Sequence, residues 1–314
     1  MKNVIACLLV LGIIAGVAPA PVQAQTDLEA KIDSLFVIAS SGEVRFRDQN
    51  EPAMDSIAAL GRPAVPILID KFTTKSARER WTIIWILERI GSEAVPDLVE
   101  ALERPNGLVV QRVAWALGAI KDTAAVLPLA GVSDHPRWQV RNQAVLALGK
   151  IGDTRGGDAV LAALSDSIGQ VRTAAVVSAG KLGLTMAVQP LIRLLADDFY
   201  GARQMAMVSL MKLDTPMVVE ALGEAMADDP PLIGQLACRV LGKLGTPRAI
   251  EILHEQVVTG DQERVTAAAL ALVEADPLDN CGFRILYLSK LDDRLARLKV
   301  ESAIAETTDE QRQP

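Results

Sequence analysis

Residue types that commonly carry catalysis or bind metals are scarce in this chain. Its 314 residues include two His and three Cys. The histidines, His135 and His254, are widely separated, and HExxH, GxSxG, P-loop and CxxC motifs are absent from the sequence. Adjacent acidic residues such as Asp197 and Asp198 fall in predicted turns, where helix capping accounts for them. We therefore expect no enzymatic activity, no metal site and no cofactor.

The charge balance also restricts the kind of partner. The chain has 32 Lys and Arg against 39 Asp and Glu, a formal net charge of −7. A nucleic-acid-binding protein needs a basic face for phosphates, so we expect no nucleic-acid partner. The composition, 50% hydrophobic and 4% aromatic, is typical of a globular helical protein.

A repeat positions the remaining candidate residues. Short segments ending in a Leu/Ile-Gly-like junction recur at intervals of 30 or 31 residues, at Gly61, Gly91, Lys121, Gly152, Gly183, Asp214, Gly245 and Asp276. Each interval can hold two helices of about eleven residues and two turns. Threonines stand where N-caps are expected (Thr154, Thr185, Thr215 and Thr246), and prolines where first turns are expected (Pro63, Pro216 and Pro247). Strand signals are missing.

One segment makes the repeat recognisable. Residues 140–153, VRNQAVLALGKIGD, resemble the second helix and exit turn of a HEAT-like repeat, of the short variety found in phycobilisome-lyase-type proteins. Residues 171–182 and 202–213 follow the same pattern. The resemblance implies an all-α fold, an α-α superhelix (solenoid) of about seven repeats with capping helices. It also implies that the second helices line a concave surface, and it leaves scaffold, adaptor and enzyme-subunit functions open.

The predicted organisation has five parts. Residues 1–24 form a signal peptide, with Lys2, an apolar stretch and a small-residue site before Gln25. Residues 25–60 are N-terminal capping helices, with a capping box at Thr26 and a second helix starting at Asn50. Residues 61–276 are the solenoid, 277–300 a C-terminal capping helix and 301–314 a flexible acidic tail.

The leader predicts an exported protein, periplasmic or secreted. No membrane insertion is expected after signal cleavage, although an uncleaved N-terminal anchor is the alternative. The mature chain would keep Cys238 and Cys281. These lie more than one repeat apart, too far for a disulfide in a stack of helices, so we expect two unpaired thiols.

Equivalent positions of the second helices give the candidate binding residues. One column is mostly apolar and opens with two tryptophans, with Trp81 a turn before the first: Trp85, Trp115, Leu146, Val177 and Val208. An exposed apolar column indicates a partner-binding face, with tryptophans as anchors. The alternative is that curvature or the N-terminal cap buries this column.

Two further columns are polar. One contains uncharged hydrogen-bonding side chains, including Gln111 and Asn142, which could grip the main chain of a peptide or belong to an ordinary solvated surface. The other contains Lys150, Lys181, Lys212 and Lys243. It could attract acidic partners, or it could place cations at the negative ends of helices.

Two more columns are interpreted as structural. The first holds Arg80, Arg141, Arg172 and Arg203, which are expected to form charged pairs between turns and the next repeat, with Asp134, Asp166 and Asp197 as partners. Four glycines are expected to allow close helix approach: Gly118, Gly149, Gly180 and Gly242.

Three functions remain open from the sequence. The first is a non-enzymatic scaffold that binds a protein or peptide through its concave face. The second, implied by the resemblance, is an auxiliary subunit of a cofactor-attaching enzyme. The third is an envelope adaptor that self-associates through a leucine stripe in 285–298, a stripe that could equally be a cap. The oligomeric state does not follow from the sequence.

Overall fold

The computed structural model describes residues 20–213, 216–227, 231–259 and 262–275. Every regular element in these residues is a helix. The chain divides into two compact units, residues 1–98 and 99–314, and each is described separately. The predicted C-terminal capping helix, the acidic tail, Cys281 and most of the signal peptide lie outside the described residues.

The first unit contains four α-helices and the start of a fifth. They are α1 (Ala20–Ala39), α2 (Asn50–Ala58), α3 (Val65–Asp70), α4 (Ala77–Ile90) and α5 (Val95–Ala101), which crosses the boundary. Helix α2 begins at Asn50 as predicted. Helix α1 begins at Ala20 and not at the capping box of Thr26, because the intervening residues continue the helix and Pro21 is compatible with a first turn.

The second unit is a series of helical pairs. Its longer helices are α6 (Gly107–Ile120), α8 (Trp138–Ile151), α10 (Gly169–Leu182), α12 (Tyr200–Leu213), α14 (Pro231–Leu244) and α16 (Gln262–Ala275). Each starts 31 residues after the one before and has 14 residues, which confirms the predicted repeat. The first helices that precede α8 to α16 in their pairs are α7 (Val126–Gly131), α9 (Gly157–Ala163), α11 (Val188–Arg193), α13 (Pro216–Ala225) and α15 (Pro247–Thr259).

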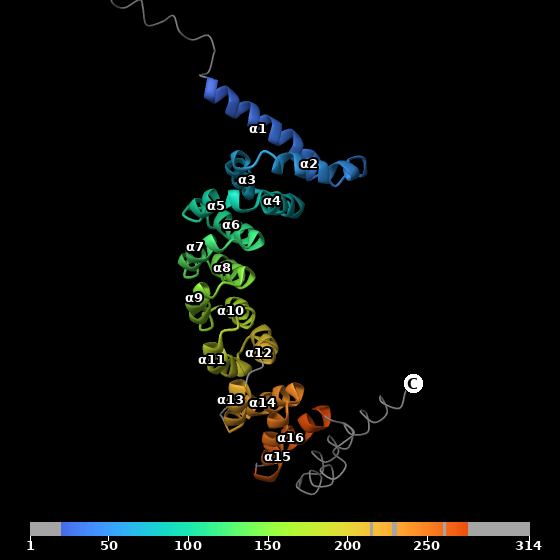
Figure 1. Cartoon of the computed structure of the whole chain (residues 1–314), viewed down its shortest axis with the longest axis vertical. Coiled ribbons are helices and arrows are strands. Elements are labelled where there is room, and N and C mark those ends of the chain that lie inside the picture. Colours follow the sequence, from blue (N-terminus) through green and yellow to red (C-terminus); the bar gives the residue numbers. More distant parts are fainter. Residues whose placement is uncertain (1–19, 214–215, 228–230, 260–261, 276–314) are drawn as a thin grey trace, which may run out of the picture. The chain divides into compact units, whose positions relative to one another are not determined.

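The two helices of a pair differ in length, which the prediction of eleven residues each did not anticipate. Helices α7 and α11 have only 6 residues, each preceded by a 3-10 turn. Pro128 and Pro190 lie within these short helices, where proline limits the main-chain hydrogen bonds. Figure 1 shows α7, α9 and α11 as one layer and α8, α10 and α12 as the other.

The capping predictions were correct in part. The Thr246 hydroxyl accepts a hydrogen bond from the Ala249 N–H at 3.3 Å, and Pro63, Pro216 and Pro247 lie in first turns. Thr154 is not a cap, because Asp153 precedes it and accepts from the Arg155 N–H at 2.9 Å. The cap position before Thr185 is Leu184, which has no side-chain acceptor. Thr215 lies outside the described residues.

Successive second helices approach one another at glycines. A Cβ added to Gly149 would lie 2.7 Å from Ser178 Cα, and one added to Gly118 would lie 2.8 Å from Ala147 Cα. The Ser178 hydroxyl donates to the Val145 carbonyl at 2.8 Å, across the same α8–α10 contact. The predicted role of the glycines in close packing is thereby confirmed.

Arginines and aspartates join neighbouring repeats. Arg141 donates two hydrogen bonds to the Asp166 carboxylate (2.6 and 2.9 Å), and Arg172 donates two to Asp197 (both 2.7 Å). Arg172 also donates to the Asp166 main-chain carbonyl at 2.8 Å. Each aspartate thus accepts from the previous repeat through its carboxylate and from its own repeat through its carbonyl. We call this series the Arg–Asp ladder, and it confirms the predicted pairing for Asp166 and Asp197. The prediction was wrong for Arg80 and Asp134: Arg80 donates to the Lys75 carbonyl at 2.8 Å, and Arg141 donates to the His135 carbonyl at 2.9 Å and not to Asp134.

The ladder changes the ionisation of its aspartates. Burial by itself would raise the pKa of Asp166 and Asp197. Hydrogen bonds from Arg141 and Arg172, together with a main-chain N–H two residues on, outweigh burial, so the pKa of both carboxyls lies below its ordinary value. The Asp197 side chain is 5% exposed. Both carboxylates therefore stay charged well into the acid range.

Candidate functional site

Helix α4 carries the two most exposed tryptophans of the chain's described part. Ser76 caps the helix by accepting from the Glu79 N–H at 3.3 Å, and Gly91 ends it with a φ of 72°. Ile83 and Leu87 are fully buried on one face. The opposite face presents Trp81 and Trp85, a turn apart, which follows from the 3.6-residue period of the helix.

These two indoles form a pair on the surface. Trp81 is 46% exposed and Trp85 is 47% exposed. Their ring centroids are 6.1 Å apart and their planes meet at 39°. Exposed paired indoles offer a large rigid apolar area, the feature most often found at the centre of protein interfaces. The possibility that the N-terminal cap buries these residues is therefore wrong for Trp81 and Trp85.

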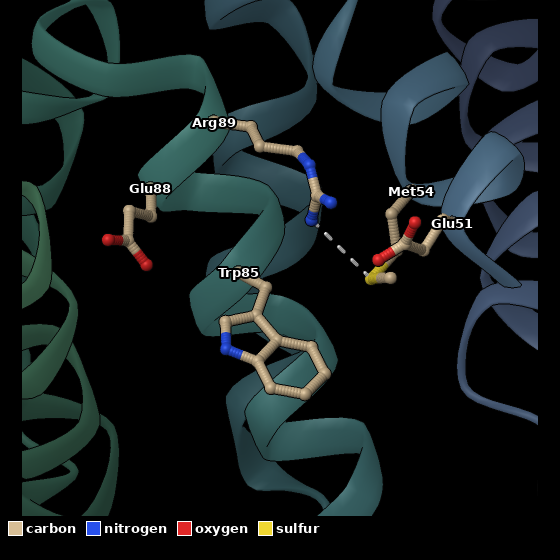
Figure 2. A pocket seen from close by; sticks show the side chains of 5 residues that line it. All are labelled: Glu51, Met54, Trp85, Glu88 and Arg89. Carbon is tan, nitrogen blue, oxygen red and sulfur yellow. Dashed lines mark hydrogen bonds between the residues drawn. The ribbon is translucent and has the colours of Figure 1, made fainter.

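A pocket lies beside Trp85, between α2 and α4. It has a volume of about 450 Å³ and is lined by Glu51, Met54, Trp85, Glu88 and Arg89. Figure 2 shows that Glu51 and Met54 project from α2, whereas Trp85, Glu88 and Arg89 project from α4.

A second cavity of about 450 Å³ continues from this pocket and shares Glu51, Met54 and Trp85 with it. It extends along residues 41–44 and is also lined by Arg47 and Arg78. We call the two together the α2–α4 groove.

The charges in the pocket are unevenly compensated. Arg89 forms an ion pair with Asp55 at 2.8 Å and points Nη1 at the Met54 sulfur, 3.9 Å away. Glu51 and Glu88 are exposed, and neither forms an ion pair or a side-chain hydrogen bond with any other described residue. The pocket therefore combines an apolar wall with two uncompensated carboxylates.

The other end of the groove is basic. Arg78 donates to the Ser41 carbonyl at 3.3 Å, which holds its guanidinium at the end of α4. Arg47 is exposed on the 3-10 turn Val44–Gln49. The groove thus has carboxylates around Trp85. Around residues 41–47 it has guanidinium groups and one carboxylate, Glu43, which is paired with Arg45 at 2.6 Å.

The sequence missed the α2 side of this groove. Glu51 and Met54 lie outside the repeat, so no column of equivalent positions identified them. The available signal was their spacing of three residues at the start of the helix predicted from Asn50, which places both on one face. Met54 is buried, and it forms the floor next to the exposed Trp85.

The remaining column residues belong to the second unit. Trp115, Leu146, Val177 and Val208 are each half-buried, on α6, α8, α10 and α12. Because these residues belong to the second unit, they are described separately from the two tryptophans of α4. Gln111 is also half-buried, and Asn142 donates its side-chain amide to the Gln170 carbonyl at 2.8 Å, an inter-repeat bond within the protein.

The lysine column is exposed at helix ends. Lys150, Lys181, Lys212 and Lys243 all lie in the last turns of their helices, α8, α10, α12 and α14. In this position a cation stabilises the helix through its dipole by about 0.3–1 kcal/mol. Their location is compatible with both interpretations of the column, as a surface that attracts acidic partners and as cations that stabilise helix ends.

Other chemistry is limited in the described residues. No group of three or more His, Cys, Asp or Glu side chains in that part of the chain could hold a metal ion. None of the helices searched there is long and apolar enough to cross a membrane. Cys238 is a free, buried thiol whose pKa is raised to about 12 by burial. It is therefore a poor nucleophile at neutral pH.

Comparison with known proteins establishes the family. The family model for HEAT repeats matches residues 65–133, 127–211 and 189–273, which together make up more than half of the chain. The chain belongs to the HEAT-repeat family. Among curated proteins no match was found.

Solved structures give distant similarities. One is the CpcE–CpcF complex of phycocyanin lyase from Nostoc sp. PCC7120, with 18% identity, a TM-score of 0.41, and coverage of 77% of this chain and 94% of that one. Another is YibA of E. coli, with 15% identity, a TM-score of 0.47, and coverage of 93% and 98%. Human deoxyhypusine hydroxylase has 18% identity, a TM-score of 0.31, and coverage of 81% and 99%.

Proposed function

We propose that this HEAT-repeat protein is an exported, non-enzymatic scaffold that binds a protein or peptide through the α2–α4 groove. The observation that carries the proposal is the exposed pair Trp81 and Trp85 beside a pocket. Nearly half of each indole's surface is exposed to water, so a partner that covers this apolar surface would gain favourable burial energy. The half-buried column from Trp115 to Val208 is proposed as a second, weaker contact area on the other unit.

The test is peptide selection on the purified full chain. A displayed library of random 12-residue peptides is selected, and the dissociation constants of the recovered peptides are measured by fluorescence polarisation. The variant Trp81→Ala/Trp85→Ala should weaken binding by about 30-fold, the effect of losing an anchor worth about 2 kcal/mol. Leu127→Ala, an exposed apolar residue of α7 in the other unit, is the control and should leave affinity unchanged.

Two results would contradict this function. One is that no peptide binds the full chain above background, and the other is that the double variant binds as well as the unaltered protein. Far-UV circular dichroism of the double variant checks that its helices are intact. Export is tested separately, by finding a mature N-terminus at Gln25 in a periplasmic fraction.

A further inference from the structure

We infer that the pocket beside Trp85 takes a basic side chain, lysine or arginine, of the bound peptide. This inference rests on the proposed function and specifies its partner. It starts from the pocket's composition: an indole wall, a thioether floor and two carboxylates that no other described residue compensates. In Figure 2 the Trp85 indole lies between Glu88 on one side and Glu51 with Met54 on the other.

Charge decides between the possible ligands. The pocket's own cation, Arg89, is already neutralised by Asp55 at 2.8 Å. Glu51 and Glu88 therefore leave the pocket with a net negative charge. The two carboxylates would repel an anionic side chain. A neutral side chain would displace the water that hydrogen-bonds to these carboxylates and would not replace those hydrogen bonds. A cation replaces those bonds and compensates the charge.

The aromatic and aliphatic surfaces favour the same ligand. Tryptophan gives the strongest cation–π attraction of the aromatic residues, and the exposed Trp85 face is accessible from the pocket. The methylene stem of lysine or arginine can lie against Met54 and the indole while its charged end reaches a carboxylate. A pocket of about 450 Å³ is large enough for one such side chain.

The opposite end of the groove fixes an orientation. Arg47 and Arg78 line the second cavity together with Glu43, whose charge is compensated by Arg45 at 2.6 Å, so a basic residue is less favoured there than at Trp85. The bound peptide is thus expected to place its basic residue at Trp85 and its neutral or acidic residues towards residues 41–47. This polarity distinguishes the inference from a general attraction of basic peptides to an acidic protein.

The experiment repeats the peptide selection on three forms of the full chain: unaltered, Glu51→Gln/Glu88→Gln, and Glu100→Gln/Glu224→Gln. The last pair are exposed glutamates of the second unit and remove the same charge elsewhere. Peptides selected on the unaltered chain should be enriched in Lys or Arg. Replacing that residue by norleucine or citrulline should weaken binding by about fivefold or more, at low salt more than at high salt.

The pocket variant should lose both the enrichment and the fivefold effect, whereas the control variant should keep both. The inference is overturned if the selected peptides lack basic residues or are enriched in acidic ones. It is also overturned if the Glu51→Gln/Glu88→Gln variant selects peptides as rich in Lys and Arg as the control variant does. If those peptides still depend on Trp81 and Trp85, the proposed function survives this failure. If no peptide is selected, both the proposed function and this inference are wrong.

Discussion

Replacing Gly149 by alanine should destabilise the protein, although the same change in an ordinary helix stabilises it. A Gly→Ala change inside a helix normally contributes about 1 kcal/mol of stability. At Gly149 the new methyl group would lie 2.4 Å from Ser178 Oγ and 2.7 Å from Ser178 Cα. The last contact is with main chain, so a side-chain rotation cannot relieve it, and α8 and α10 must separate.

The magnitude follows from two costs. Overpacking of this kind costs about 1–3 kcal/mol, and separation would also weaken the Ser178–Val145 hydrogen bond, worth about 1 kcal/mol. After the gain in helix propensity, we expect a net loss of about 2 kcal/mol. Local opening of α8 and α10 should then become about 30-fold more frequent.

The assay is hydrogen–deuterium exchange with mass spectrometry on peptides from α8 and α10, with urea unfolding followed by circular dichroism. Gly131→Ala is the matched control, because nothing lies within 4 Å of a Cβ at that exposed position and its φ is not positive. The control should stabilise by about 0.5 kcal/mol. If Gly149→Ala stabilised as much as the control, the close approach of α8 and α10 would be refuted.

Three further outcomes follow from the same structure. Asp197→Asn should lower stability at pH 7 by about 2 kcal/mol because Arg172 loses its two-bond contact with a buried carboxylate and keeps only the exposed Asp198 carboxylate and the Asp166 carbonyl. Since the folded pKa of Asp197 is lowered, this contribution is present above the unfolded pKa and disappears as pH falls through the folded one. The urea midpoints of the two proteins should therefore converge in acid. Cys238 should resist iodoacetamide at pH 8 until the protein is unfolded in urea, measured by peptide mapping; rapid labelling of native protein would contradict its burial. In urea unfolding, Leu148→Ala should lower the free energy of unfolding by about 2–5 kcal/mol, because Leu148 is fully buried. Leu127→Ala should change it by no more than about 0.5 kcal/mol, because Leu127 is 63% exposed.

The repeat could be predicted because its signals are local and recur. The second helices α6 to α16 start at a constant interval, and the glycines and arginines that join them occupy equivalent positions. The ladder partners were identified, but their geometry was not: Asp166 lies six residues before Arg172 and gives it a carbonyl, while its carboxylate binds Arg141, 25 residues earlier. Sequence spacing alone does not say which oxygen of an aspartate is used.

The candidate site was harder to predict because half of it lies outside the repeat. Trp81 and Trp85 were found from their column. Glu51 and Met54 come from α2, whose position against α4 depends on tertiary packing of the N-terminal helices and not on any periodic pattern. The short first helices were also missed. Proline lies inside α7 and α11, but α9 has 7 residues and no proline, so proline alone does not explain their length.

The Arg–Asp ladder also limits how such a chain can change in length. Arg141 and Arg172 each bind a carboxylate 25 residues ahead and a carbonyl six residues behind, so both distances are set by the period. Removing residues 151–181, one whole period, would bring Asp197 to the place of Asp166 and let Arg141 bind it. A deletion that is not a whole number of periods would leave the Arg141 guanidinium, which is 15% exposed, without its carboxylate and with only the His135 and Pro136 carbonyls as acceptors. Evolution of the second unit should therefore proceed by gain or loss of complete periods.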